Sequence, residues 1–507
     1  MSQHQIFERA RLSRDPRFDG RFFVGVHTTG IYCRPVCPAN PPKSENVSFY
    51  PSAAAAGEAG FRPCLRCRPE CAPGSPAWNG TSTTVNRGLK LIRSGALDDN
   101  GVEVLAERLG VTSRHLRRLF TRHLGASPQA VAHTQRLHFA KRLIDETRLP
   151  MQDIALASGY GSVRRFNDAF RKTYGRTPRD LRRRGAERLP QATSTSLSVR
   201  LSAVQPYDWP GLMAFYAARA IPGVESVDGE TYSRTVRFGE AAGLIRASYD
   251  AETGSVIVSL TGIDTQQLFP VVQRLRDLFD IDAPVQSIAG VLGGDPLLAG
   301  LLRNRPGIRV PGAWDGFELT VRAILGQQVS VKAATTMAGR IAARYGESVV
   351  DELADELAEE TTGQSADRPG NAPAGLQYTF PPPERLRRAR FNGIGLVKRR
   401  AQAIRNVAAA VADGDIRFDA GQDPADLHAA LTSVRGVGDW TAAYVAMRAA
   451  KNPDALPASD LGLLRAFDRD GEPRMRPREL EARAERWRPW RAYAAMLLWS
   501  STPGSGG

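Results

Sequence analysis

The feature that most constrains the fold of this chain is its use of cysteine. All five cysteines lie between Cys33 and Cys71, and four of them form two short-spaced pairs, Cys33-x-x-x-Cys37 and Cys64-x-x-Cys67. Such pairs let four sulfurs reach one tetrahedral zinc ion at about 2.3 Å. In a reducing compartment this clustering favours metal ligation over a disulfide framework. The spacing alone therefore predicts a small domain held by one structural zinc, with Cys71 left as a surface thiol.

The whole chain, with 507 residues, is too long for one compact core. Stretches rich in Pro, Gly, Ser and Thr divide it, the middle block shows helical periodicity, and the last block has short β-rich stretches followed by helices. We expect a multidomain protein, mainly α with α+β parts. The expected segments are a zinc domain (1–75), a linker (76–84), an all-α domain (85–188), a linker (189–197), an α+β subdomain (198–312) and a helical body (313–507) with a disordered insertion (351–375).

The charge balance points to a polyanionic partner. The chain has 68 Lys and Arg against 53 Asp and Glu, a formal net charge of +15, which favours salt-dependent association with nucleic acid. The N-terminus has no apolar signal core, and no apolar run approaches the roughly 20 residues that a bilayer crossing requires. These observations predict a cytoplasmic protein without a membrane partner.

The residues around the cysteines carry more information than the spacing. The run Gly-Val-His-Thr-Thr-Gly-Ile-Tyr-Cys33-Arg-Pro-Val-Cys37, together with Gly-Phe-Arg-Pro-Cys64-Leu-Arg-Cys67, resembles the N-terminal domain of Ada-type DNA methylphosphotriester methyltransferases over about residues 5 to 70. The resemblance implies a zinc-bound Cys33 that also accepts the methyl group. Four thiolates on one divalent zinc give a site of net charge −2, so methylation of one ligand would reduce its repulsion of phosphate.

The middle block contains two helix-turn-helix candidates. The first turns at Gly110 and opens a helix near Ser113, and the second opens a helix near Ser162 and ends in a Tyr-Gly-x-Thr-Pro sequence. This ending resembles the AraC-type DNA-binding domain, which implies that the two helices read successive major grooves. The alternative is a pair of packed helices with a solvated basic face. The expected DNA-contacting side chains are Arg114, Arg117, Arg118, Arg164 and Arg165.

A glycine hairpin carries the catalytic prediction. The sequence Val434-Arg-Gly436-Val437-Gly438-Asp-Trp440-Thr441 predicts a turn between two helices that exposes N–H groups to a phosphate. Such a hairpin alone indicates DNA binding and no chemistry. The following Leu-Pro-Ala-Ser-Asp460, with flanking runs such as Phe-Tyr-Ala-Ala-Arg from Phe215 and Ile-Leu-Gly-Gln-Gln328, resembles 3-methyladenine DNA glycosylase II of the helix-hairpin-helix superfamily over about residues 198 to 502.

The resemblance assigns roles to individual residues. Asp460 is expected to stabilise the oxocarbenium-like centre that forms as the glycosidic bond breaks. A cationic alkylated base would stack on aromatic rings after flipping, although each ring taken alone is typical of ordinary core. The expected base-pocket residues are Phe215, Trp440, Tyr444 and Trp499. Related enzymes that also cleave the strand carry a lysine where this chain has Trp440, so a monofunctional enzyme is implied.

Two positions depart from the family, and one basic run is ambiguous. Gln328 is expected to contact DNA, but it stands where relatives have an apolar wedge that fills the gap left by the flipped base, so intercalation is expected to be weaker or to use Val329. Leu461 stands where an aromatic is expected. Both departures affect the substrate range more than the reaction type. The run from Arg385 to Arg400 is interpreted as a solvated helix face, with phosphate contacts from Lys398 or Arg399 as the alternative.

These observations predict a fused alkylation-repair enzyme and promoter-binding activator. The expected partners are double-stranded DNA, both as alkylated sites and as a promoter operator, and RNA polymerase; zinc is the one expected cofactor. One alternative is a transcription factor with a structural zinc and an inactive glycosylase-like domain. Another is a glycosylase with a mere targeting module and an inert Cys33.

Overall fold

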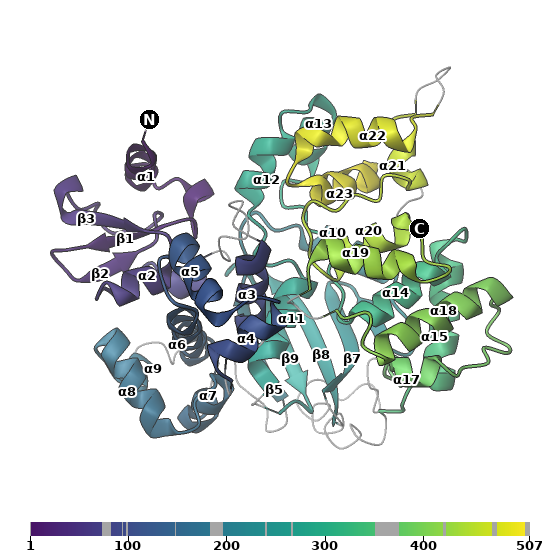
Figure 1. Ribbon diagram of the computed structural model, residues 1–507, viewed down its shortest axis with the longest axis horizontal. Coiled ribbons are helices and arrows are strands. Elements are labelled where there is room, and N and C mark those ends of the chain that lie inside the picture. The colour runs from purple at the N-terminus through teal and green to yellow at the C-terminus, as the bar shows by residue number, and fades with distance from the viewer. Residues whose placement is uncertain are drawn as a thin grey trace. The chain divides into compact units, whose positions relative to one another are not determined.

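The computed structural model describes residues 2–72, 83–93, 95–97, 100–147, 149–182, 196–238, 241–264, 267–349, 375–418, 422–468 and 474–501. They form two compact units (Figure 1). The first unit consists of Met1–Ala192 with the short segments Asp264–Gln273 and Asp282–Gln286, and the second consists of Thr193–Ile263, Arg274–Ile281 and Ser287–Gly507. Most of both predicted linkers lies outside the described residues, as does the predicted insertion 351–375 apart from Gly375. Within the described part of the chain, no helix is long and apolar enough to cross a membrane.

The first unit begins with a small α+β module, as the cysteine spacing predicts. Its four-stranded sheet has the order β3-β1-β2-β4, in which only β2 and β4 run parallel. A small aromatic core around Phe22, with Phe7, Phe18 and Phe49, supports one side. The elements are α1 (Gln3–Leu12), β1 (Phe23–Val26), β2 (Ile31–Cys33), β3 (Val47–Tyr50), α2 (Ala53–Glu58) and β4 (Arg62–Pro63), with 3-10 turns at Pro16–Phe18, Ser44–Asn46 and Pro69–Cys71.

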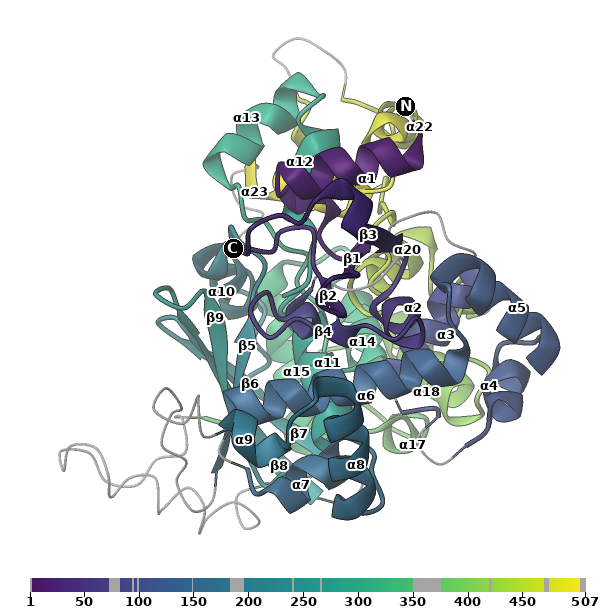
Figure 2. The ribbon, with the colours of Figure 1, turned by 90° about the vertical axis from the view of Figure 1, so that its left-hand side faces the viewer.

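Helices complete the first unit. The helix α6 contacts α3, α5, α7 and α9, and so lies between two helix-turn-helix pairs, α4–α5 and α7–α8 (Figure 2). Thr112 caps α5 and Ser162 caps α8 through side-chain oxygens, at the predicted helix starts. The bounds are α3 (Thr83–Arg93), α4 (Val102–Arg108), α5 (Ser113–Leu124), α6 (Pro128–Glu146), α7 (Met151–Ala157), α8 (Val163–Tyr174) and α9 (Pro178–Arg182).

The second unit opens with an antiparallel five-stranded sheet of order β5-β9-β8-β7-β6. The short β-rich stretches expected at the start of the last block are confirmed, with two of them, 232–238 and 254–260, overlapping β7 and β9. Alternating side chains such as Val256, Val258 and Leu260 are buried, which is the period-2 pattern of a half-buried strand. The strands are β5 (Ser196–Ser202), β6 (Glu225–Asp228), β7 (Thr231–Phe238), β8 (Ala241–Asp250) and β9 (Ser255–Thr261).

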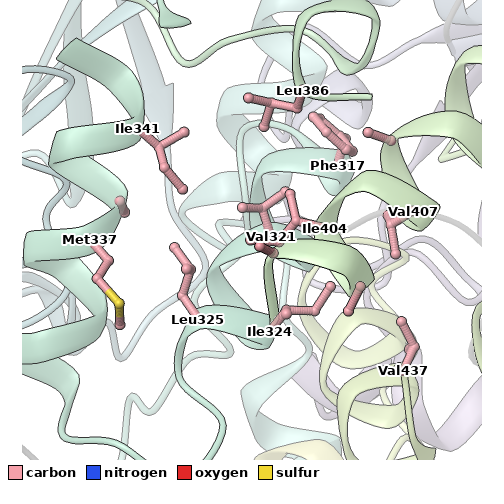
Figure 3. Close-up of a cluster of buried hydrophobic side chains, with 14 of the residues drawn as sticks. Phe317, Val321, Ile324, Leu325, Met337, Ile341, Leu386, Ile404, Val407 and Val437 are labelled. Carbon is pink, nitrogen blue, oxygen red and sulfur yellow. The ribbon is translucent and has the colours of Figure 1, made fainter. Parts of the chain in front are cut away.

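Helices form the rest of the second unit. A buried core joins α14, α15, α18 and α20 through side chains such as Val321, Ile341, Ile404 and Val445 (Figure 3). This core fixes the helix ends that carry the candidate site. The helices are α10 (Trp209–Ala217), α11 (Leu268–Leu278), α12 (Val285–Leu292), α13 (Pro296–Asn304), α14 (Gly316–Leu325), α15 (Val331–Tyr345), α17 (Pro383–Leu386), α18 (Lys398–Ala412), α19 (Pro424–Ser433), α20 (Asp439–Arg448), α21 (Leu461–Arg465), α22 (Pro477–Ala484) and α23 (Arg491–Ser501), with a 3-10 turn at Glu485–Trp487. The first residues of α11 (268–273) and of α12 (285–286) belong to the short segments grouped with the first unit.

Candidate active site, DNA interface and zinc centre

A cavity of about 230 Å³ lies in the second unit. The structure brings the five residues predicted for base excision to its wall, from four helices. Phe215 comes from α10, Trp440 and Tyr444 from α20, Asp460 from the start of α21 and Trp499 from α23. The wall is mainly apolar, as expected of a pocket for a planar ligand.

Asp460 is held firmly in this cavity. It is the N-cap of α21, and its Oδ1 accepts a hydrogen bond from the Leu463 amide at 3.1 Å. The indole N–H of Trp440 donates to Oδ2 at 2.8 Å, and that of Trp499 donates to Oδ1 at 2.8 Å. Three donors from two helices and the backbone therefore fix the orientation of the carboxylate.

The aromatic rings of the cavity already have partners. Trp440 and Tyr444 are stacked, with ring centroids 5.3 Å apart and an angle of 9° between planes. The guanidinium of Arg219 lies 4.0 Å from the ring centroid of Phe215, and that of Arg448 lies 4.8 Å from the same centroid. The Phe215 ring thus already contacts two cations of the protein itself.

Both of these arginines, Arg219 and Arg448, lower the pKa of Tyr444. Arg448 donates a hydrogen bond to the Tyr444 hydroxyl at 2.6 Å, and Arg219 also contacts this hydroxyl. Burial alone would raise the pKa of Tyr444, but the positive charges of Arg448 and Arg219 outweigh burial and hold the pKa below its usual value. The cavity wall around Tyr444 is therefore electropositive beside an acceptor hydroxyl.

The third cavity arginine, Arg322, belongs to a buried ion cluster. It contacts Glu225 at 2.8 Å and Glu318 at 3.1 Å, and both carboxylates also pair with Arg234. Burial opposes ionisation, but Arg322 and Arg234 lower the pKa of Glu225 to about 2. Two cations and two carboxylates balance one another, so this cluster adds rigidity and no net charge to the cavity.

The predicted hairpin lies between α19 and α20. Gly438 is the N-cap of α20 and no side chain caps the helix, so backbone N–H groups are available to a phosphate. Gly436 has a φ of 102°, and a Cβ there would lie 2.5 Å from that of Ala403 on α18. Only glycine fits this turn, because it is left-handed and pressed against a neighbouring helix.

The other predicted hairpin contacts face inward. The side chains of Val437 and Thr441 are buried, with only 6% and 1% exposed. The Thr441 hydroxyl accepts a hydrogen bond at 3.2 Å from Gln327, which also donates to the carbonyl of Gly436 at 3.3 Å. The expectation that Thr441 contacts DNA therefore applies to its backbone alone, and its side chain ties the hairpin to the loop after α14.

Gln328, the predicted replacement for an apolar wedge, lies in that loop. It is exposed and left-handed, with a φ of 56°. Gly326 and Val329, on either side of it, line the cavity. Leu461, the other departure, is 58% exposed directly after Asp460. Both departures therefore lie beside the cavity rather than inside it.

The basic run from Arg385 to Arg400 is not one helix face, and that interpretation is wrong. It covers the end of α17, a loop with left-handed Phe391, Gly393 and Gly395, and the first turn of α18. The glycines end the helical path, because each lies in a region that helices do not use.

In the first unit, the four predicted zinc ligands come together. The sulfurs of Cys33, Cys37, Cys64 and Cys67 all lie within 4.8 Å of one another. A tetrahedral zinc with bonds of about 2.3 Å needs sulfurs about 3.8 Å apart, so the set fits the ion. Contact with Cys33 lowers the pKa of Cys37 to about 7.

The two cysteine pairs differ in exposure. Cys33 and Cys37 are partly exposed, whereas Cys64 and Cys67 are buried. Only the first pair can therefore meet a substrate in this conformation. The side chain of Cys71, expected as a surface thiol, lies outside the described part of the structure.

A polar network next to the zinc centre was not expected from the sequence. The hydroxyl of Tyr32 lies 2.9 Å from Nε2 of His138 on α6, and Arg68 pairs with Asp145 of α6 at 3.0 Å. Lys141 lies 3.6 Å from Glu70. Burial lowers the pKa of His138 to about 4, so its ring is neutral at neutral pH. The network joins the zinc module to the helix between the two helix-turn-helix pairs.

The recognition-helix arginines lie opposite the buried faces. α5 buries Leu116, Phe120 and Leu124, and α8 buries Phe166, Phe170 and Tyr174, at the same four-residue steps. All five predicted arginines are exposed, namely Arg114, Arg117, Arg118, Arg164 and Arg165. Arg117 pairs with Glu103 at 3.0 Å and Arg118 contacts His115.

Four family models match successive parts of the chain. They are the metal binding domain of Ada (residues 7–70), a helix-turn-helix domain (105–184), the AlkA N-terminal domain (198–315) and the HhH-GPD superfamily of base excision DNA repair proteins (321–492). With the four clustered thiols, the first match identifies one zinc site.

Curated relatives match either the whole chain or its parts. A probable bifunctional transcriptional activator/DNA repair enzyme AlkA from Mycobacterium tuberculosis (strain ATCC 25618 / H37Rv) is 42% identical over 98% of this chain and 97% of the relative. The DNA-3-methyladenine glycosylase 2 of Escherichia coli (strain K12) is 31% identical over 58% of this chain and 94% of the relative. The bifunctional transcriptional activator/DNA repair enzyme Ada of the same strain is 41% identical over 24% of this chain and 32% of the relative.

Proposed function

Because the chain belongs to the family of bifunctional transcriptional activators and DNA repair enzymes, we propose that it excises alkylated purines of the 3-methyladenine class and couples this repair to promoter binding. The observation that carries the proposal is Asp460, held by Trp440 and Trp499 inside an aromatic cavity beside a phosphate-binding hairpin.

In the proposed excision, the base enters the cavity and the Asp460 carboxylate faces the sugar. Alkylation makes the purine cationic, so the glycosidic electron pair leaves with the base without prior protonation. Asp460 stabilises the positive charge that develops on the sugar. Water then adds to the sugar carbon and loses a proton. Trp440 cannot form a Schiff base with the sugar, so the strand stays intact.

We further propose that Cys33 accepts a methyl group from a methylphosphotriester. The four cysteines would hold one zinc ion, which keeps the acceptor sulfur deprotonated and electron-rich. The Cys33 sulfur attacks the methyl carbon, the bond from carbon to phosphate oxygen breaks, and the phosphate leaves as an anionic diester. The partial exposure of Cys33 supports this role, because the sulfur must reach the DNA backbone.

The helix-turn-helix helices would place this chemistry at promoters. The exposed arginines of α5 and α8 supply the contacts to an operator, and activation there implies contact with RNA polymerase. Loss of one negative charge on methylation reduces repulsion from phosphate and raises DNA affinity. We propose a cytoplasmic location for such a protein, because its substrate is cellular DNA.

One incubation separates this function from its rivals. The full chain is mixed with DNA treated with a methylating agent, the released bases are identified by chromatography, and the protein is analysed by mass spectrometry. We expect free 3-methyladenine and a single methyl adduct on Cys33. If no base is released, the result supports the alternative of a transcription factor with an inactive glycosylase-like domain. If Cys33 stays unmodified, the result supports a zinc module that only targets the glycosylase to DNA.

A further inference from the structure

A second basic feature lies on the glycosylase unit, outside the cavity of Asp460. It is an open cleft of about 1140 Å³, here named the Lys398 cleft, at the start of α18. None of the described residues that line it is acidic. Its cationic residues are Arg340, Arg390, Lys398, Arg399, Arg405 and Arg435.

Two of these cations are structural and four are available. Arg340 donates to the carbonyl of Ile394 at 3.1 Å, and Arg405 donates to that of Ala389 at 3.1 Å. Within the described ranges, the side chains of the other four have no hydrogen-bond or ion-pair partner, and all four are exposed. They are Arg390, Lys398, Arg399 and Arg435. A cleft that is lined by unpaired positive charges attracts an extended polyanion.

A triplet similar to the hairpin sequence lines the cleft through its two glycines. Gly393-Ile394-Gly395 is separated from α18 by two residues, whereas Gly436-Val437-Gly438 leads directly into α20. Gly393 and Gly395 have φ values of 74° and 91°. As in α20, no side chain caps the first turn of α18. The first turn of each helix thus leaves backbone N–H groups without a side-chain cap. Those of α18 lie in the Lys398 cleft, and those of α20 follow the adjoining hairpin.

The hairpin and the cleft form one continuous surface. Gly436 itself lines the cleft and packs on Ala403 of α18. The side chain of Asn406 donates to the carbonyl of Arg435 at 3.2 Å, which fixes the residue before the hairpin to the same helix. The cleft therefore adjoins the position at which the hairpin would hold a DNA backbone.

We propose that the Lys398 cleft binds phosphates of the DNA duplex next to those held by the hairpin. The proposal rests on the proposed glycosylase function, since the hairpin is taken to hold the damaged DNA. The cleft suits backbone rather than bases, because its one aromatic residue, Phe391, is only 4% exposed and cannot stack on a base.

The test compares two double variants of the full chain with equal loss of charge. Lys398→Gln/Arg399→Gln removes two cleft cations, whereas Arg385→Gln/Arg387→Gln removes two arginines of the same run that pair with Glu347 and Asp413 outside the cleft. Single-turnover excision of 7-methylguanine from a duplex is measured against protein concentration at several salt concentrations.

We expect the half-saturating concentration of the cleft variant to rise about tenfold, with far less change in the plateau rate. The slope of log affinity against log salt should fall by about two, roughly one for each phosphate that the variant no longer binds. The control variant should match the wild type. Equal effects in both variants, or none in the cleft variant, would overturn the proposal.

A second measurement does not depend on excision. Lys398 is acetylated with a water-soluble reagent in the presence and absence of undamaged duplex DNA, and the modified fraction is read by mass spectrometry. Protection of Lys398 by DNA supports the cleft even if the wild type releases no base, which would then count against the glycosylase function alone. Unchanged acetylation contradicts the cleft.

Discussion

Asp460 accepts three hydrogen bonds, and a carboxylate has about four lone-pair sites. About one site is therefore left for water or the developing charge on the sugar. The donors belong to α20, α21 and α23, so the helical core determines which way this site points. A change at Trp440 or Trp499 should accordingly alter the orientation of the carboxylate and leave its charge in place.

At the same scale, the lowered pKa of Tyr444 predicts a pH dependence. As pH rises through this pKa, which lies below the usual value of about 10, the hydroxyl loses a proton and the cavity loses one net positive charge. A cationic purine then meets less repulsion, so excision of 7-methylguanine should accelerate on the alkaline side. Tyr444→Phe should abolish this rise, because it removes the ionisable hydroxyl.

The check is the single-turnover rate of both proteins from neutral pH to about pH 10, where an ordinary tyrosine is half ionised. Parallel profiles for the wild type and Tyr444→Phe would show that another group, or the substrate itself, controls the alkaline rate. Circular dichroism of the variant controls for misfolding.

Some cavity residues were predictable one by one, and others were not. The five predicted residues reach one wall, although their roles remain predictions. Arg219 and Arg448 were not predicted, yet each lies four residues after a predicted aromatic, Phe215 or Tyr444, a spacing that puts both on one helical face. The contact of Arg322 with Glu225 spans 97 positions and has no local signal.

At the scale of elements, local sequence determined most helix starts. Thr112 and Ser162 cap α5 and α8 where the sequence predicts, because capping depends on a few neighbouring residues. The interpretation of the run from Arg385 to Arg400 as a helix face was wrong because it relied on charge alone. Gly393 and Gly395 in the same run already indicated a turn.

The hairpin gives a prediction at this scale. Gly436→Ala places a Cβ at a φ of 102° and 2.5 Å from Ala403, so the hairpin must move away from α18. We expect the half-saturating protein concentration in single-turnover excision to rise about tenfold, because the displaced hairpin holds one or two phosphates less well. The free energy of unfolding should fall by more than about 1 kcal/mol.

Gly414→Ala is the matched control. Gly414 also has a positive φ, of 83°, but a Cβ there meets nothing within 4 Å. Its substitution should cost about 1 kcal/mol of stability and leave DNA affinity unchanged. Both quantities come from denaturant titration and single-turnover excision, and equal DNA affinities for the two variants would show that the clash with Ala403 does not matter.

At the scale of the whole molecule, two compact units carry separate sites. The zinc centre and the recognition helices belong to the first, and the cavity, hairpin and Lys398 cleft belong to the second. Short local motifs in the sequence marked the four cysteines, the two helix-turn-helix pairs and the hairpin, whereas we expected separate zinc and helix-turn-helix domains and did not predict that they form one unit. Contacts between segments far apart in the sequence were not predictable. The hydrogen bond between Tyr32 and His138, for example, joins residues 106 positions apart.

Because the zinc centre and the cavity belong to different units, loss of zinc should affect the zinc module and leave base excision unchanged. Cys64→Ser removes one ligand from a module whose own apolar core is small, so zinc binding and the fold of that module should both be lost. Excision of 7-methylguanine should continue. Zinc content by atomic spectroscopy and the excision rate of the same sample provide the check; a variant that keeps one zinc, or that loses excision with the metal, contradicts the division.

The most direct test of the proposed excision is the single-turnover rate of Asp460→Asn on a duplex with one 7-methylguanine, beside Asp468→Asn as a surface control. The amide keeps the size of the side chain and removes its negative charge. We predict a plateau rate lower by about 10² to 10³ with DNA affinity retained, and a control equal to the wild type. An Asp460→Asn protein that excises the base at the wild-type rate would contradict the assigned role of this carboxylate.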